Sequence, residues 1–277
     1  TSFFLPFVTE KEGEPVSIET EKIRSRQKVD ETLVAEVGAE VYDFIDYHMD
    51  LSNSNHIVFS TTTRFNIDRL PAEHYSNLVN LRRINDIRYI NKFFESVNAK
   101  VPHEGIFVGC AETKNQRKER ILAKFPPVLN IMLYSVDFIV KRIFPKFTLT
   151  KKVYFFLTRG NNRVISKAET LGRLYSCGFE MEDEMNIDGY FYFAARKKGH
   201  PAFDENPTYG PFIKLPRIGK NGKQISVYKL RTMHPFAEYI QDYVYHKHSL
   251  QNGGKFHNDF RITTLGKIFR KFWLDEI

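Results

Sequence analysis

The stretch FEMEDEMNIDGYFYFAARKK (residues 179–198) decides the fold class, because its two β-rich runs predict a hairpin. Immediately before it, SKAETLGRLYSCG (166–178) has the apolar spacing of a helix, with Ser166 as N-cap and Gly178 at its end. The run KKVYFFLT (151–158) is rich in aromatic residues and predicts a strand. Read outward from the hairpin, the elements are therefore a helix and, before it, another strand.

The same alternation continues toward the N-terminus. Strands are predicted over 56–63, 74–81 and 105–112, and helices over 31–49, 85–100 and 115–144, the last interrupted by Pro126 and Pro127. Such alternation predicts an α/β fold with a mostly parallel sheet and flanking helices. The stretch GHPAFDENPTY (199–209) holds glycine, asparagine and two prolines, which predicts a domain boundary. We expect an N-terminal extension and helix over 1–50, the α/β domain over 51–200 and a C-terminal domain over 201–277.

The positive charge is concentrated in the last quarter of the chain. The 277 residues carry a net charge of +8, and residues 210–277 hold 12 Lys or Arg against five Asp or Glu. This distribution favours an anionic partner for the C-terminal part, and a solvated basic surface is the alternative. The two cysteines, Cys110 and Cys177, offer neither metal-ligand spacing nor a disulfide framework, so a reducing compartment is expected.

The hairpin and the elements before it resemble a known fold. The order strand, helix, PHEGIFVG strand, helix and GFE hairpin over 56–198 is similar to the C-terminal half of class I, Rossmann-like S-adenosylmethionine methyltransferases. Those enzymes use a glycine-rich turn after the first strand to bring backbone close to the cofactor, and we find no such turn in this sequence. We therefore expect that S-adenosylmethionine is not bound and that the domain is a scaffold or binds a partner. A working methyltransferase with an unrecognised cofactor site is the alternative.

Two further features of this region each allow two interpretations. Asn85, Asp86 and Arg88 follow a predicted strand, so they either belong to a site or, for Asn85 or Asp86, cap the next helix. PPVLNIMLYSVDFIVKRIF (126–144) is mostly apolar with a narrow polar stripe. It is either a helix buried in the fold, which we favour, or a helix lying in a membrane interface. Its apolar runs are too short to predict a transmembrane span.

The last 68 residues carry the most specific pattern. GPFIKLPRIGKNGKQISVYKLRTM (210–233) predicts two strands, and its Asn-Gly pair favours positive φ angles and a tight hairpin. NDFRITTLGKIFRKFWLDEI (258–277) predicts an amphipathic helix. Its apolar side is formed by Leu265, Ile268, Phe269, Phe272 and Trp273, and its basic side by Lys267, Arg270 and Lys271.

Asp275 and Glu276 stand where this helix would end. Carboxylates at a helix C-terminus face the negative end of the helix dipole, so the pair breaks a local rule and is a modest pointer to function. Two adjacent carboxylates beside arginine and lysine suit a Mg²⁺ ion together with phosphate oxygens, and an aspartate can attack phosphorus as a nucleophile. A solvated helix end explains the pair without any chemistry, and the residue types alone leave both interpretations open.

The two C-terminal motifs together resemble the bacterial sugar transferase family over residues 210–277. The matching pattern is GP-F, RIG-x-x-GK and YKLRTM, followed by D-x-RIT-x-x-G-x-x-x-RK-x-x-LDE. Members of this family are monotopic phosphoglycosyl transferases that start capsule, O-antigen and exopolysaccharide assembly. The resemblance implies that a phosphosugar passes from a nucleotide diphosphate sugar to a polyprenyl phosphate lipid, and that the nucleoside monophosphate leaves. It also implies a location at the cytoplasmic face of the inner membrane.

Within the matching motifs, the resemblance implies roles for seven residues. Asp275 would attack the sugar-bearing phosphorus and form a covalent phosphosugar intermediate, and Glu276 would hold Mg²⁺. Phosphate binding or fixing of the fold is implied for the basic positions Arg217, Lys229, Arg231, Arg261 and Arg270. The sequence does not separate those two roles.

The sequence departs from the family pattern in three places. Where the family has an apolar, proline-kinked membrane helix before the GP motif, this chain has the polar stretch 199–209. Trp273 stands where the family has a small hydroxyl residue before LDE. The family also continues past the two carboxylates, so we expect the site to be completed by sequence beyond Ile277 in a longer parent protein. Without that sequence, we expect an open and inactive site.

A non-catalytic interaction protein is therefore the alternative to an enzyme. In that interpretation the α/β domain recruits partners, and the basic tail binds lipid or a complete transferase. No recognised nucleic-acid-binding module is present in the sequence, so nucleic acid is not an expected partner. His246, His248 and His257 have no cysteine partner, and a polar loop explains their spacing better than a metal site does.

Overall fold

The computed structural model describes residues 30–51, 55–202, 210–247, 256 and 259–274. The chain divides into two compact units, residues 1–44 and residues 45–277. Residues 30–37 are helical, and Gly38 with φ +87° separates them from α2 (Ala39–Met49). The helix predicted over 31–49 is therefore interrupted, because glycine adopts this left-handed backbone angle without a steric cost.

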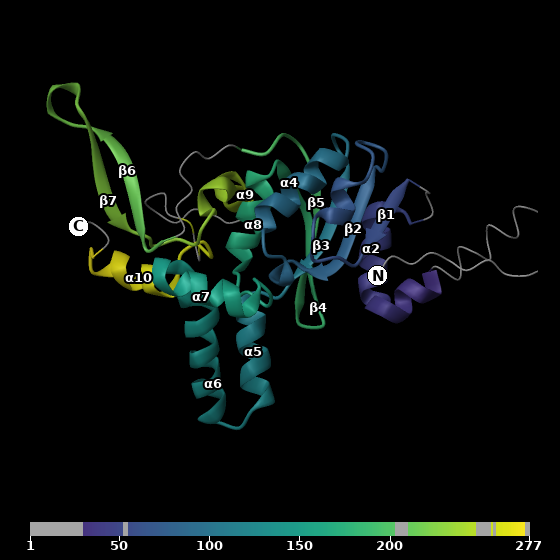
Figure 1. The fold of residues 1–277 in the computed structure, drawn as a ribbon, viewed down its shortest axis with the longest axis horizontal. Coiled ribbons are helices and arrows are strands. Elements are labelled where there is room, and N and C mark those ends of the chain that lie inside the picture. The colour runs from purple at the N-terminus through teal and green to yellow at the C-terminus, as the bar shows by residue number, and fades with distance from the viewer. Residues whose placement is uncertain (1–29, 52–54, 203–209, 248–255, 257–258, 275–277) are drawn as a thin grey trace, which may run out of the picture. The chain divides into compact units, whose positions relative to one another are not determined.

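The second unit contains a five-stranded sheet (Figure 1). Its strands are β1 (His56–Phe59), β2 (Asn77–Arg83), β3 (Ile106–Ala111), β4 (Phe179–Ile187) and β5 (Tyr190–Lys197), in the order β1-β2-β3-β5-β4. The first three strands are parallel, and β5 lies antiparallel between β3 and β4. The α/β class and the hairpin predicted at 179–198 are thus confirmed.

Aromatic side chains from distant parts of the sequence build the core of this unit. All six residues of β3 are buried, as expected of a strand covered on both faces. The ring centroid of Phe107 on β3 lies 5.8 Å from that of Phe94 on α4 (Ile90–Lys100) and 5.7 Å from that of Phe193 on β5. The short helix α3 (Phe65–Asp68) packs against α4. Phe107 therefore packs β3 against the helix α4 and against the neighbouring strand β5.

The helix before the hairpin has the ends that the sequence predicts. It is α8 (Lys167–Ser176), and the Ser166 hydroxyl accepts a hydrogen bond from the backbone N–H of Glu169 at 3.1 Å. Gly178 follows the helix with φ +82°. Most residues of α8 are buried, so the helix directly before β4 has a defined start, a defined end and a place in the core.

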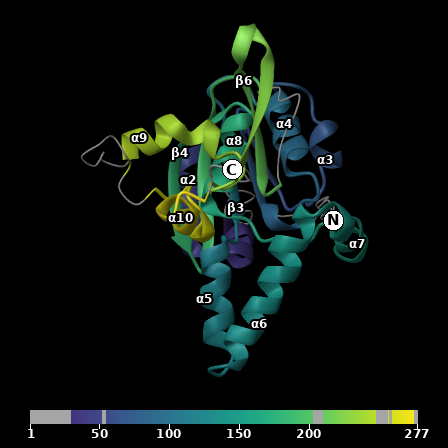
Figure 2. The same cartoon turned by 90° about the vertical axis from the view of Figure 1, so that its left-hand side faces the viewer.

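Between β3 and β4 the chain makes a helical excursion, defined as residues 114–158. It consists of α5 (Lys114–Lys124), α6 (Leu129–Phe138), a π-helical turn (Ile139–Ile143), a 3-10 turn (Phe144–Lys146) and α7 (Thr148–Thr158). Helices α5 and α6 lie side by side in both views (Figures 1 and 2). The predicted interruption at the two prolines is confirmed, because the turn between these helices contains them.

Two predictions for the helical excursion are wrong. Residues 151–158 belong to α7 and are not a strand, and α6 contains no buried residue, although we favoured a buried helix there. On α7 the side chains of Leu149, Phe156 and Leu157 are 86%, 83% and 72% exposed. Aromatic residues favour strands because they fit a half-buried pleated surface, and here no strand pairs with the segment. An apolar pattern predicts an apolar face, and it does not predict what covers that face.

The C-terminal part of the second unit begins with the predicted hairpin. Strands β6 (Phe212–Ile218) and β7 (Gln224–Leu230) are antiparallel, and Asn221 and Gly222 between them have φ +60° and +73°. A 3-10 turn (Ala237–Ile240), α9 (Gln241–Lys247) and α10 (Thr264–Lys271) follow. The amphipathic helix predicted within 258–277 is thus α10. The domain boundary predicted at 199–209 falls largely outside the described residues and stays a prediction.

Gly172 of α8 lies against the segment that leads into α9. A Cβ atom at Gly172 would lie 2.2 Å from the backbone oxygen of Phe236. We expect Gly172→Ala to destabilise the protein by about 1–3 kcal/mol, although alanine is the better helix former, because overpacking outweighs helix propensity. Urea unfolding followed by circular dichroism measures the change.

The control for this experiment is Gly199→Ala, because a Cβ atom there meets no atom within 4 Å. The control is expected to unfold like the wild type. A Gly172→Ala protein that is equally stable would contradict the close packing of α8 on Phe236.

Candidate functional site

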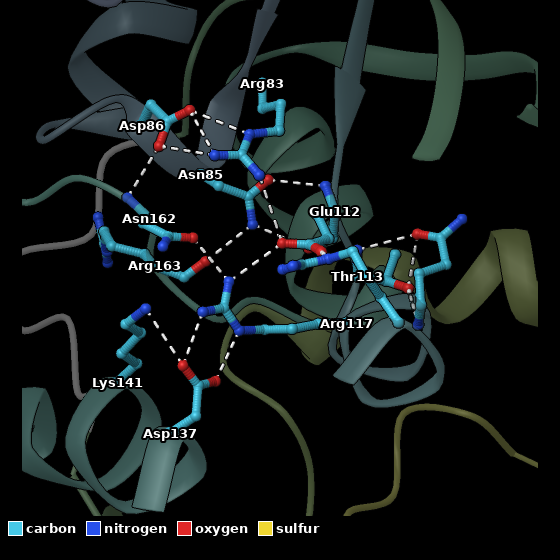
Figure 3. Close-up of polar contacts among 12 residues, drawn as sticks. Arg83, Asn85, Asp86, Glu112, Thr113, Arg117, Asp137, Lys141, Asn162 and Arg163 are labelled. Carbon is cyan, nitrogen blue, oxygen red and sulfur yellow. Dashed lines mark hydrogen bonds and ion pairs between the residues drawn. The ribbon is translucent and has the colours of Figure 1, made fainter. Parts of the chain in front are cut away.

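Charged side chains gather where β2 and β3 end (Figure 3). The carboxyl ends of parallel strands meet at one edge of a sheet, where open α/β folds bind their ligands. Glu112 follows β3 directly, and its side chain is 2% exposed. Three guanidinium groups donate hydrogen bonds to its carboxylate, from Arg120 at 2.6 Å, Arg117 at 3.0 Å and Arg83 at 3.4 Å. One buried carboxylate thus collects three positive charges at this edge.

Arg117 extends this network to α6. Its Nε and Nη2 donate to the two carboxylate oxygens of Asp137 at 2.6 and 2.7 Å. The Nζ of Lys141 lies 3.1 Å from the same carboxylate. Burial alone would raise the pKa of Asp137, but the hydrogen bonds and charge of Arg117 hold it below its usual value. The network therefore anchors the helical excursion to the edge of the sheet.

Asn85 joins three segments in the interior of the network. Its side-chain amide nitrogen donates to the backbone oxygens of Glu112 and Arg163, both at 2.8 Å. Its Oδ1 accepts a hydrogen bond from the backbone N–H of Glu112 at 2.7 Å. Asn85 is buried, so these bonds satisfy an amide that would otherwise be costly to remove from water.

Asp86 is an ion-pair partner and not a helix cap. It pairs with Arg83 at 3.0 Å and accepts a hydrogen bond from the backbone N–H of Asn162 at 2.9 Å. Its 3-10 turn (Ile84–Asp86) ends before α4, whose N-cap residue Tyr89 makes no side-chain capping bond. The capping interpretation of Asn85 and Asp86 is therefore wrong.

The network at the sheet edge holds elements together. Figure 3 shows its acidic groups directed at arginine and lysine side chains, the amide of Asn85 directed at backbone groups, and the amide oxygen of Asn162 directed at Arg117. Among the residues that the structure describes, no three His, Cys, Asp or Glu side chains are arranged to hold a metal ion. The expectation that S-adenosylmethionine is not bound stays a prediction.

In the C-terminal part, the buried Arg261 fixes the segment before α10. Its Nε and Nη2 donate to Asp259 at 2.9 and 2.8 Å, and its Nη1 donates to Gln241 of α9. Burial alone would raise the pKa of Asp259, but the hydrogen bonds of Arg261 hold it below its usual value. Of the two roles implied for Arg261, these contacts favour the fixing of the fold.

The other four predicted basic residues are less deeply buried. The Nε of Arg231 donates to the backbone oxygen of Gly210 at 2.9 Å, and burial lowers the pKa of Arg231. The Nε of Arg270 on α10 donates to the Thr232 hydroxyl at 3.1 Å. Arg217 is exposed on β6, and Lys229 is half-buried on β7. The structure thus brings Arg231 and Arg270 to the end of β7, with Arg217 near its far end.

Four of the residues singled out in the sequence lie outside the described residues, namely Asp275, Glu276, His248 and His257. His246 is exposed on α9. Before the two carboxylates, the backbone of Trp273 has φ +57° and its side chain is 77% exposed. A bulky residue seldom adopts this left-handed conformation. The Trp273 departure noted in the sequence therefore coincides with the turn that ends α10.

His234 is a contact residue that the sequence analysis missed. Its Nδ1 lies 3.1 Å from Nη2 of Arg142, and its Nε2 lies 3.3 Å from Nζ of Lys114. The Nη1 of Arg142 donates to Glu169 at 2.6 Å. A single histidine carries no spacing signal, so only the tertiary fold identifies this connection between the C-terminal part, the helical excursion and α8.

Within the described part of the chain, no helix is both long enough and apolar enough to cross a membrane.

The three arginines around Glu112 give a testable consequence for stability. We expect Glu112→Gln to destabilise the protein by about 1–3 kcal/mol, because the buried position loses charge-assisted hydrogen bonds from three guanidinium groups, while Arg117 keeps Asp137 and Arg83 keeps Asp86. Thermal and urea unfolding measure the loss. Glu119→Gln is the control, since Glu119 is an exposed residue on the same helix as Arg117. Equal stability of the two variants would contradict the anchoring role of Glu112.

Comparison with known proteins finds similarity in the C-terminal part. Residues 205–277 match the family described as bacterial sugar transferase. An uncharacterized sugar transferase of Haemophilus influenzae is 36% identical over 93 residues, which cover 32% of this chain and 18% of that protein. The chain therefore spans about a fifth of the length of the curated relative that it matches.

Solved structures align with about half of the chain. A possible exported protein from Bordetella parapertussis has a TM-score of 0.30 at 15% identity, covering 48% of this chain and 42% of its own. S-adenosylmethionine-dependent methyltransferases from Methanosarcina mazei and Thermotoga maritima have TM-scores of 0.31 and 0.29 at 11% and 12% identity. They cover 47% and 48% of this chain, and 62% and 61% of their own.

The family match and the sequence motifs coincide in position, since both cover β6, β7, α9 and α10 and both reach Ile277. The methyltransferase resemblance noted in the sequence reappears among the solved structures, at a level that carries no functional argument. The last quarter of this chain is a segment similar to the bacterial sugar transferase family.

Proposed function

We propose that this chain is part of a phosphoglycosyl transferase, which moves a phosphosugar from a nucleotide diphosphate sugar to a polyprenyl phosphate in cell-surface polysaccharide synthesis. The observation that carries the proposal is the family match over residues 205–277, which ends in the LDE motif. The sugar transferase relative from Haemophilus influenzae supports the same class of activity.

The proposed chemistry is a double displacement at phosphorus. A carboxylate oxygen of Asp275 attacks the sugar-bearing phosphorus, and the bond from that phosphorus to the bridging oxygen breaks. The nucleoside monophosphate leaves with the bonding electron pair, and the phosphosugar stays on Asp275 as an acyl phosphate. A phosphate oxygen of the polyprenyl phosphate then attacks the same phosphorus and regenerates the carboxylate.

Glu276 is the proposed ligand of Mg²⁺. Adjacent carboxylates are oxygen donors of the kind that Mg²⁺ prefers, and the ion would neutralise charge on the diphosphate. The basic residues divide by their contacts. Arg270 and Lys229 are the proposed phosphate ligands, and Arg231 contributes charge from the same end of β7, whereas Arg217 lies toward the other end of the hairpin. Arg261 is committed to Asp259 and supports the site by fixing the segment before α10.

The lipid acceptor places the proposed reaction at a membrane surface, on the cytoplasmic face. Exposed apolar side chains of α10 and of the two residues after it support this location, namely Leu265, Ile268, Phe272 and Trp273. The exposed apolar residues of α6 and α7 support it as well, and they favour the membrane-interface interpretation of residues 126–144. The α/β domain would then present the transferase segment at that surface.

The nucleophile can be tested directly. We expect Asp275→Asn to lower nucleoside monophosphate release from a panel of nucleotide sugars, with polyprenyl phosphate and Mg²⁺ present, by at least about 10³-fold, because the covalent step is lost. The assay uses the natural gene product, whose intact mass is first compared with 32.5 kDa. Asp242→Asn, an exposed position on α9, is the matched control and is expected to be fully active.

Two results would remove the proposed mechanism. Full activity of Asp275→Asn would exclude Asp275 as the nucleophile. A wild-type protein that releases no nucleotide from any donor, with or without Mg²⁺, would favour the non-catalytic interaction protein.

The division of the basic residues makes a second prediction. We expect Arg261→Ala to destabilise the protein by about 3–5 kcal/mol, because the buried Asp259 loses its partner. Arg270→Ala, at an exposed position, is expected to change stability by less than about 1 kcal/mol and to raise the KM for the nucleotide sugar. Urea unfolding and initial-rate kinetics separate the two effects. A stable Arg261→Ala protein with a raised KM would reassign Arg261 to phosphate binding.

A further inference from the structure

A cleft of about 1480 Å³ lies between α4, the helical excursion, α8 and the segment before α9. Residues of α4, α7, α8 and the turn before α9 line it, and all of them belong to the second unit. Nine of its lining side chains are lysine or arginine, and two are glutamate. The volume exceeds the roughly 300–1,000 Å³ of a typical small-molecule site, so it accommodates a charged group with a substantial attached part.

The deep wall of the cleft holds two arginines on one carboxylate. Glu169 of α8 is buried, and it receives Arg142 at 2.6 Å and Arg173 at 3.0 Å. Burial alone would raise the pKa of Glu169, but these two guanidinium groups hold it far below its usual value. The guanidinium of Arg173 also lies 4.4 Å from the ring centroid of Phe236. The wall is rigid, and it carries more positive than negative charge.

Arg88, which is exposed, and Arg163, which is half-buried, add further positive charge to the lining of the cleft. Among the described residues, neither forms an ion pair with a carboxylate, and both guanidinium groups lie about 6 Å from the ring of Phe155. The Nη1 of Arg163 donates to the backbone oxygen of Arg88 at 3.2 Å. The pKa of Arg163 is lowered to about 10, mainly by burial and secondly by the nearby charge of Arg173. The positive charges of Arg163 and Arg173 are thus held near each other, the carboxylate of Glu169 offsets part of their repulsion, and an anion in the cleft would relieve the rest.

The backbone fixes these two arginines in place. Gly160 has φ +87°, and a Cβ atom there would lie 2.8 Å from Cγ of Arg88. The loop that carries Arg163 therefore packs directly on Arg88, which distinguishes the pair from flexible surface lysines. Lys151 and Lys152 of α7 lie at the rim, exposed, and form no ion pair within the described chain.

We propose that this cleft binds a phosphate or diphosphate group, with Arg88 and Arg163 as its direct ligands and Lys151 and Lys152 as supporting charges. Guanidinium groups match phosphate oxygens in a forked geometry, and a partly buried site strengthens each charged hydrogen bond. The aromatic lining, which includes Phe155 and Phe236, suits the organic part of the ligand. The inference rests on the cleft alone and does not depend on the transferase activity or on Asp275.

Two sources supply this chemistry, a soluble phosphate compound and the headgroup of a lipid. Inorganic pyrophosphate, titrated calorimetrically at about 0.15 M salt, tests the first, where distant surface charges are screened. Vesicles of equal parts phosphatidylcholine and phosphatidic acid, compared with pure phosphatidylcholine in a flotation assay, test the second. We expect saturable pyrophosphate binding with a Kd below about 1 mM. Flotation with the anionic vesicles alone, lost in the same variants, would instead assign the cleft to a lipid headgroup.

Two variants remove ligands from the cleft, and one matched variant does not. Arg163→Gln deletes a direct ligand, and Lys151→Gln combined with Lys152→Gln deletes two exposed rim charges. Each is expected to weaken binding by about tenfold, the loss of one charged hydrogen bond. Lys118→Gln combined with Lys124→Gln is the control, because both residues are exposed on α5, outside the cleft, and the change in net charge equals that of the α7 pair. The control is expected to bind within about twofold of the wild type.

Three results would overturn the inference. These are wild-type protein that binds neither pyrophosphate nor anionic vesicles, cleft variants that bind as tightly as the wild type, and a control that weakens binding as much as the α7 pair does. Circular dichroism checks the fold of each variant. If Arg163→Gln unfolds, the exposed α7 pair and its control decide the question.

Discussion

The buried carboxylate of Glu169 is the interaction on which the second unit depends. It lies on α8 and holds Arg142 of the helical excursion and Arg173 of its own helix. Arg142 reaches onward to His234 in the C-terminal part. A carboxylate removed from water is costly unless it is paired and fully hydrogen-bonded, and the two arginines meet that condition only when all three segments are in place. One charge thus links the assembly of α8, the helical excursion and the C-terminal part.

Glu112 has the corresponding role at the edge of the sheet. Both carboxylates are surrounded by more positive than negative charge, and both bind the helical excursion, Glu112 through α5 and Glu169 through the π-helical turn. The excursion is therefore fixed by ion pairs at its base, while its apolar side chains on α6 and α7 face outward. This arrangement differs from that of a core helix, in which apolar burial supplies the attachment.

The ion pairs at the base of the helical excursion also form part of the wall of the cleft. Ion pairs hold Arg142 and Arg173 in the wall of the cleft, and the loop after α7 brings Arg163 beside Arg88. The C-terminal part contributes Phe236 to the lining of the cleft, and this residue lies within the segment that is similar to the sugar transferase family. The two parts therefore pack together along α8, where Gly172 leaves room for the backbone of Phe236.

The sequence by itself determined the elements whose cause is local. Ser166 caps α8, the Asn-Gly pair turns the β6–β7 hairpin, and the run at 105–112 forms a strand covered on both faces. It also determined the resemblance of the last quarter, because motif spacing is a property of the chain alone. Thr263 as the N-cap of α10 was equally readable, since a threonine before an amphipathic helix is a start signal.

Only the tertiary structure decided the features that depend on partners. Residues 151–158 have the composition of a strand and form α7, because no strand of the sheet pairs with them. Asn85 and Asp86 looked like caps and instead bind Glu112 and Arg83, which lie near them only after β2 and β3 pair. The cleft gathers residues from 88 to 239, and no local pattern indicates such a meeting. Propensity and periodicity indicate which secondary structure a segment favours. The residue that pairs with a charge, or that covers an apolar face, depends on the tertiary fold.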